Sequence, residues 1–180
     1  AVERLLREAR DAFESDDTEQ AKALLAEAAA IDPSNPMPFI QLAFTHLQLH
    51  EHKESVRAAE RAVEREPDNP GTHSMFGLML SFADQTAAAE AAFNRALEID
   101  PSCAPAILHL ARLRDRNDDE DGALYLYRRA AALGDLTDDA TAHFARILMR
   151  QGKEDEAETV LRQALEDHSD RSDARHLLAS

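Results

Sequence analysis

The fold is decided by residues 70–103, which read PGTHSMFGLMLSFADQTAAAEAAFNRALEIDPSC. Apolar residues recur in this segment at three- and four-residue steps, in two stretches that a short polar turn separates. This periodicity predicts two amphipathic helices. Pro101 then ends the unit, because proline cannot continue a helix.

The same pattern recurs along the chain with a period of 34 residues. The prolines show the period first, since Pro33, Pro67 and Pro101 stand 34 residues apart. Three columns of small residues extend it over five copies: Ala9, Ala43, Gly77, Ala111 and Ala145; Ala21, Ser55, Ala89, Ala123 and Ala157; and Ala28, Ala62, Ala96, Ala130 and Ala164. Such columns indicate that the two helices of each copy approach too closely there for a larger side chain.

Large apolar residues fill other columns and predict the core between the helices. Leu25, Phe93, Tyr127 and Leu161 form one of these columns. The register defines five copies, residues 2–35, 36–69, 70–103, 104–137 and 138–171, and a partial copy or capping helix over 172–180. We therefore expect a single domain over residues 1–180.

The helix–turn–helix unit resembles the tetratricopeptide repeat, and the resemblance covers nearly the whole chain. Residues 70–103 match best, with small, aromatic and proline residues in the family's places: Gly77, Ala89, Phe93, Ala96 and Pro101. The resemblance implies an all-α fold, a right-handed superhelical solenoid of antiparallel helix pairs whose first helices line a concave groove. It also implies binding of a protein or peptide and leaves the partner open, because the family is a scaffold with many uses.

In that arrangement the first helices of copies two to five present two kinds of surface to the groove. Copies two and three present the apolar side chains of Met37, Ile40, Phe44, Leu47, Leu78 and Phe82. Copies four and five present the basic side chains of His109, Arg112, Arg116, His143, Arg146 and Arg150. Part of the apolar set belongs to the core between copies, whereas a concave apolar patch usually marks a partner site.

The basic set follows the motif His-x-x-Arg-x-x-x-Arg, which occurs twice, 34 residues apart. On adjacent helices it predicts an array of basic side chains that would bind an acidic or carboxylate-bearing segment. The two histidines, with ordinary pKa values of about 6.5, would strengthen this binding as the pH falls toward about 6. Alternatively, Asp115 and Asp139 neutralise the arginines and the array is an ordinary solvated surface.

Composition excludes several other classes of protein. The net charge of −15 argues against a nucleic-acid partner. A single cysteine, Cys103, excludes an intramolecular disulfide and any multi-cysteine zinc site. We interpret this residue of the junction loop as a bystander, although a thiol that is exposed there could react. No apolar run approaches the roughly 18 residues that span a bilayer, and there is no signal-peptide pattern, so we expect a cytoplasmic protein without a membrane partner.

Two patterns contain residue types that ligate metals. His46, His50 and His52 include a metal-compatible spacing, but we interpret them as one core histidine and two residues near a turn. Residues 117–122, Asn-Asp-Asp-Glu-Asp-Gly, copy the front half of a calcium loop, but the twelfth position is Arg128 instead of glutamate. We therefore expect no metal and no cofactor, and since no catalytic signature is present, no enzyme activity.

The sequence thus predicts a non-catalytic scaffold that binds a protein or peptide in its groove. Residues 173–180, Asp-Ala-Arg-His-Leu-Leu-Ala-Ser, resemble the junction in bacterial proteins where such repeats precede a SAM-dependent methyltransferase domain. This resemblance implies an alternative, a recruitment or regulatory domain of a larger enzyme. A second alternative is self-association, with Leu177 and Leu178 packing on another copy.

Overall fold

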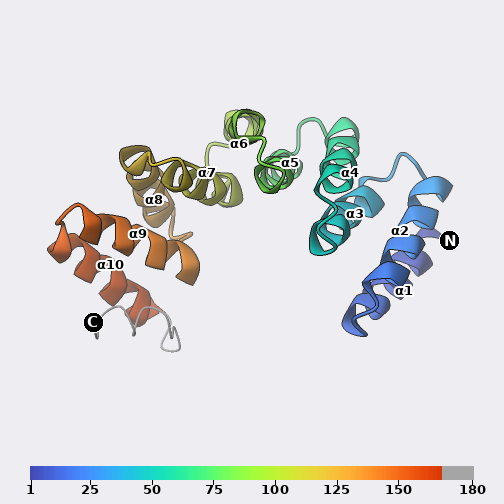
Figure 1. Ribbon diagram of the computed structural model, residues 1–180, viewed down its shortest axis with the longest axis horizontal. Coiled ribbons are helices and arrows are strands. Elements are labelled where there is room, and N and C mark those ends of the chain that lie inside the picture. Colours follow the sequence, from blue (N-terminus) through green and yellow to red (C-terminus); the bar gives the residue numbers. More distant parts are fainter. Residues whose placement is uncertain (168–180) are drawn as a thin grey trace. The chain divides into compact units, whose positions relative to one another are not determined.

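The structure, a computed structural model, describes residues 1–167, and in that range it consists of α-helices without any β-strand. The helices form antiparallel pairs, one pair in each 34-residue copy (Figure 1). They are α1 (Val2–Glu14), α2 (Thr18–Ile31), α3 (Pro36–Gln48), α4 (His52–Arg65), α5 (Pro70–Phe82), α6 (Thr86–Ile99), α7 (Ala104–Arg116), α8 (Glu120–Leu133), α9 (Asp138–Arg150) and α10 (Glu154–Asp167). The fold is an all-α solenoid of helix pairs, as predicted.

Contacts divide the chain into two compact units. The N-terminal unit is Ala1–Pro101 and contains α1 to α6, and the C-terminal unit is Ser102–Ser180 and contains α7 to α10. Each unit has its own buried apolar residues. The expectation of one domain over residues 1–180 stays a prediction.

The junctions between the early copies start a helix as well as ending one. Asn35 and Asn69 cap the next helices, since their side-chain oxygens accept hydrogen bonds from the backbone N–H of Met37, at 3.0 Å, and of Gly71, at 2.8 Å. Pro36 and Pro70 follow the caps at the first helical position, where a missing N–H removes no hydrogen bond.

The turn inside each copy also has a fixed geometry. One residue in it is left-handed in all five copies: Asp16 (φ 60°), His50 (φ 59°), Asp84 (φ 57°), Asp118 (φ 61°) and Gly152 (φ 70°). The N–H of the following residue donates to the carbonyl five residues back, as from Asp17 to Ala12 at 2.9 Å and from Glu51 to His46 at 2.8 Å. This is the Schellman arrangement, which satisfies carbonyls at the end of the first helix.

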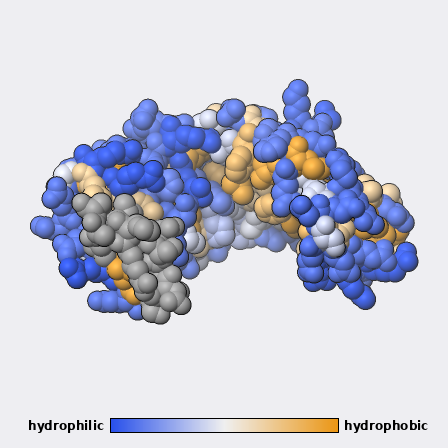
Figure 2. Space-filling view, turned by 60° about the horizontal axis from the view of Figure 1, so that its bottom comes forward, coloured by the Kyte–Doolittle hydropathy of each residue, from blue (hydrophilic) through white to orange (hydrophobic). Residues whose placement is uncertain are grey.

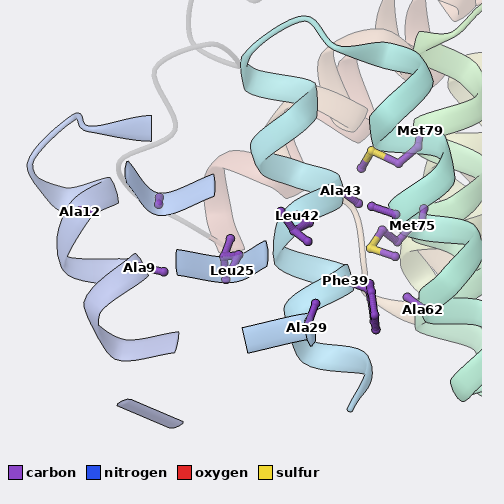
Figure 3. Packing of buried hydrophobic residues seen from close by; sticks show 13 residues of the cluster. Ala9, Ala12, Leu25, Ala29, Phe39, Leu42, Ala43, Ala62, Met75 and Met79 are labelled. Atoms are coloured by element: carbon purple, nitrogen blue, oxygen red, sulfur yellow. The ribbon is translucent and has the colours of Figure 1, made fainter. Parts of the chain in front are cut away.

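The three small-residue columns are buried in every copy, which confirms the predicted helix contacts. The column of Leu25, Phe93, Tyr127 and Leu161 is buried as well. In the N-terminal unit, Met75 and Met79 extend from α5 toward α3 and α4 (Figure 3).

Cys103 and the C-terminal residues remain to be compared with the sequence-based predictions. Cys103 is buried at the start of α7 and is not an exposed thiol of the junction loop. The partial copy over 172–180, with Leu177, Leu178 and the methyltransferase-like residues 173–180, lies outside the described residues. Among the described helices, none combines the length and hydropathy of a membrane-spanning segment.

Candidate protein-binding face

Helices α3 and α5 differ from the rest of the chain in charge. Their sequences, PMPFIQLAFTHLQ and PGTHSMFGLMLSF, contain no Asp, Glu, Lys or Arg, although 31% of the whole chain consists of these residues. Each is the first helix of its pair, and the two helices contact each other. The N-terminal unit therefore contains two adjacent helices without a charged side chain.

These two helices carry the six apolar residues that the sequence assigned to the groove. We call this set the apolar face: Met37, Ile40, Phe44, Leu47, Leu78 and Phe82. Met37 is 44% exposed, Phe44 43% and Phe82 50%, which is high for side chains of this size. The other three are half-buried and pack against the core of the unit. Figure 2 shows an apolar area over α3 and α5, bordered by hydrophilic residues.

Helix α1 continues this surface with a mixed composition. Leu6 and Phe13 stand 34 residues before Ile40 and Leu47 and also pack, half-buried, against the core. Arg10, 34 residues before Phe44, is exposed. Leu6 and Phe13 were not among the predicted groove residues, although the 34-residue register alone indicates both.

The basic residues of α7 and α9 lie among acidic ones. Arg112 pairs with Asp139 at 3.2 Å, and Arg150 pairs with Asp115 at 2.7 Å and with Glu120 at 3.0 Å. We call these residues, together with His143 and Arg146, the charged network: Arg112, Asp115, Glu120, Asp139, His143, Arg146 and Arg150. Three carboxylates stand among its three arginines, so its positive charge is offset within the C-terminal unit.

The two histidines of the predicted array have different surroundings. His143 lies 3.5 Å from Asp115, and its Nδ1 is 2.8 Å from a guanidinium nitrogen of Arg146. His109 is half-buried, and this burial, with the charge of Arg112 as a smaller cause, lowers its pKa to about 4. Burial therefore opposes the protonation of His109 at pH 6, whereas the sequence-based prediction needs that protonation to strengthen anion binding. Arg116 is exposed at the end of α7.

The residues of the two metal-like patterns form hydrogen bonds and ion pairs within the turns where they lie. His46 contacts Glu51 at 2.5 Å, a bond that is the main cause of the lowered pKa of Glu51, and Lys22 also pairs with Glu51 at 3.0 Å. Asp119 accepts a hydrogen bond from the N–H of Gly122 at 3.0 Å, which caps α8, and pairs with Arg114 at 2.9 Å. In residues 1–167, no three His, Cys, Asp or Glu side chains come together as metal ligands would.

Comparison with known proteins identifies the repeat. Sequence models described as tetratricopeptide repeat match residues 12–75, 72–103 and 116–180, most of the chain. No curated protein matches it.

Three solved structures show the same fold. TTC0263, a thermophilic TPR protein in Thermus thermophilus, is 22% identical with a TM-score of 0.78, over 99% of this chain and 97% of that one. MamA is 18% identical with a TM-score of 0.74, over 91% of this chain and 96% of that one. YrrB, described as a TPR protein with an unusual peptide-binding site, is 18% identical with a TM-score of 0.66, over 98% of this chain and 91% of that one.

Proposed function

We propose that this chain, which belongs to the tetratricopeptide repeat family, is a non-catalytic scaffold that binds a protein segment on its apolar face. The observation that carries the proposal is the exposure of Met37, Phe44 and Phe82 on two adjacent helices that have no charged side chain. In a chain of net charge −15, an exposed apolar area of this kind marks a surface that a partner covers.

The partner segment has large apolar side chains of its own. It lies extended or helical across α3 and α5, with one such side chain anchored at Phe44 and Leu78. Burying one large apolar side chain contributes about 1.5–3 kcal/mol, so two or three anchors support micromolar binding, about −8 kcal/mol.

The charged network has a secondary role in this proposal. A carboxylate of the partner reaches the guanidinium group of Arg112 only in competition with Asp139, which already pairs with it at 3.2 Å. Exchange of one carboxylate for another gains little free energy, because the ion pair that forms replaces one that is lost. We therefore assign the binding energy to the apolar face, and a preference for acidic partners to the arginines.

The test selects peptides from a displayed random library on the immobilised protein, then measures the affinity of the selected peptides by calorimetry. The variant F44R/F82R places arginine where copies four and five have Arg112 and Arg116, or Arg146 and Arg150, so it is compatible with the fold. Y125R is the matched control, since Tyr125 is an exposed aromatic residue on α8, outside the apolar face. We expect peptides rich in large apolar residues, and binding that is at least about tenfold weaker for F44R/F82R and unchanged for Y125R.

A second copy of the chain is the rival occupant of the apolar face. Light scattering at increasing protein concentration distinguishes the two cases. A dimer that F44R/F82R dissociates assigns the face to self-association and contradicts the proposal, as do selected peptides whose affinity the double variant leaves unchanged.

A further inference from the structure

A pocket lies on the side of α3 that faces away from the apolar face. Its volume is about 410 Å³, and it is lined by residues of α2, α3 and α4 and by Pro33, which lies between α2 and α3. We call it the alanine pocket and define it by six of its lining residues: Ala26, Ala29, Ala30, Phe39, Arg57 and Arg61. Both walls and the floor belong to the N-terminal unit.

The pocket has an apolar bed and a cationic rim. Ala26 and Ala30 are exposed on one turn of α2, and the aromatic ring of Phe39 lies below. That ring is buried, and the guanidinium groups of Arg61 and Arg65 lie 4.4 Å and 4.8 Å from its centre. Arg57, one turn before Arg61 on α4, is exposed at the same rim.

The corresponding positions of the next copy show why the pocket opens here. Thirty-four residues after Ala26, Ala29 and Ala30 stand Glu60, Val63 and Glu64. These side chains are larger, and two of them are acidic. The small alanine side chains of α2 thus leave space for the pocket. They also leave out the two carboxylates that Glu60 and Glu64 have at these positions in the next copy.

The rim arginines also differ from their counterpart in the next copy. Arg95 stands 34 residues after Arg61 and pairs with Glu98 at 3.1 Å and with Asp68 at 4.0 Å. In residues 1–167, no carboxylate lies within ion-pair distance of the guanidinium group of Arg57 or Arg61. The lining contains one acidic residue, Glu54. Two guanidinium groups without an acid partner thus border an apolar bed in a chain of net charge −15.

We propose that the alanine pocket is a second binding site, which takes an acidic peptide segment. One large apolar side chain of the segment packs on the exposed methyl groups of Ala26 and Ala30, and a neighbouring carboxylate accepts hydrogen bonds from Arg57 and Arg61. From Ala26 to Ala30 the helix rises about 6 Å, and an extended peptide covers this distance with about two residues. The pocket therefore has room for two neighbouring residues, and it recognises an apolar residue next to an acidic one. This inference does not depend on the use of the apolar face.

The test follows backbone amide shifts of the full chain by NMR during titration with the peptide acetyl-Glu-Glu-Phe-Glu-Glu-amide. We expect shifts in residues 26–30 and 57–61. Two control peptides, one with lysine for glutamate and one with alanine for phenylalanine, should bind at least about tenfold more weakly, since each lacks one half of the recognised pair.

Two matched variants test the contacts. R61E should weaken the acidic peptide about tenfold or more, whereas R95E, the same charge change at the same register position one copy later, should change affinity by less than about twofold. A26E/A30E, which copies Glu60 and Glu64, should abolish the shifts with little change in the melting temperature. F44R/F82R should leave this binding unchanged, because those residues lie on the other face of α3 and on α5.

Four results would overturn the assignment. They are the absence of shifts in residues 26–30 at millimolar peptide, equal loss of binding in R61E and R95E, loss of binding in F44R/F82R, and binding of dodecanoate at this pocket when the acidic peptide does not bind. The last result assigns the pocket to a fatty-acid anion instead of a peptide. Failure of the apolar-face experiment has no bearing on these outcomes.

Discussion

The ring of Phe93 occupies the space that a side chain on Gly77 would need. A Cβ atom added to Gly77 would lie 2.6 Å from Cε1 of Phe93, well inside van der Waals contact. In the other copies the position of Gly77 is alanine, and the opposing residue is Leu25, Ala59, Tyr127 or Leu161. Glycine in the third copy is therefore an adjustment to the way Phe93 packs, because glycine is otherwise a poor residue for a helix interior.

We expect Gly77→Ala to lower the free energy of unfolding by about 1–2 kcal/mol. The gain in helix propensity, about 1 kcal/mol, is smaller than the overpacking of a fully buried ring. Urea unfolding followed by circular dichroism measures the change. The double variant G77A/F93L reproduces the pair Ala9 and Leu25 of the first copy, so the penalty of G77A should shrink in the F93L background. Additive effects of the two substitutions would contradict the contact.

The lowered pKa of His109 predicts a pH dependence of stability. The unfolded chain binds a proton at this residue below about pH 6.5, whereas the folded chain does so only below about pH 4. Stability from this group is complete above pH 6.5 and is lost as the pH falls from 6.5 to 4, by roughly 3 kcal/mol in total. His109→Gln, which cannot titrate, should flatten the curve of unfolding free energy in this range. An unchanged slope would show that His109 is not protected from protonation.

The two aspartates of the charged network should differ in their contribution to stability. The Asp115 side chain is 15% exposed and contacts Arg150 and His143, whereas the Asp139 side chain is 58% exposed. We expect Asp115→Asn to destabilise the protein by about 1–3 kcal/mol and Asp139→Asn by less than about 0.5 kcal/mol. Chemical unfolding at low and high salt measures both. Equal effects, both removed by salt, would mean that the network is only a surface feature.

The left-handed turn residue offers a test of backbone strain. His50 has φ 59°, where a side chain with a Cβ is unfavourable by about 1 kcal/mol, so His50→Gly should stabilise the protein by up to that amount. Gly152→Ala should destabilise it by about 1 kcal/mol, and only through the backbone, because a Cβ there has no atom within 4 Å. Thermal unfolding of the two variants gives the signs. A stabilising Gly152→Ala would contradict the φ angle.

The sequence was sufficient to predict the helix pairs and their contacts, because these repeat. The small-residue columns and the column of Leu25, Phe93, Tyr127 and Leu161 are buried in every copy, since each copy solves the same packing problem. Family and fold followed from the same register. The apolar residues of α3 and α5 were assigned correctly to these helices, but their division into exposed Phe44 and half-buried Ile40 needed coordinates.

Features that do not repeat from copy to copy could not be predicted in full from the 34-residue register. The sequence named Asp115 and Asp139 as acids that could neutralise the arginines, but which arginine each of them contacts depends on side-chain directions that helical spacing alone does not determine. The burial of His109 depends on what covers it, so its pKa was misjudged. The alanine pocket was not predicted because Ala26 and Ala30 lie outside the small-residue columns of the repeat. At such positions an alanine does not indicate whether a pocket or an ordinary helix surface is present.

The left-handed turn finally limits how the length of this protein can change. The turn between α1 and α2 is so short that the Schellman hydrogen bond, from the N–H of Asp17 to the carbonyl of Ala12, spans it, and the other copies have the same arrangement. The turn therefore cannot take up an extra residue without a change in conformation. An inserted or deleted residue must either break that bond or rotate the second helix by about 100°, which turns its alanine columns away from the first helix. The chain can therefore be lengthened or shortened by whole 34-residue copies far more easily than by single residues within one.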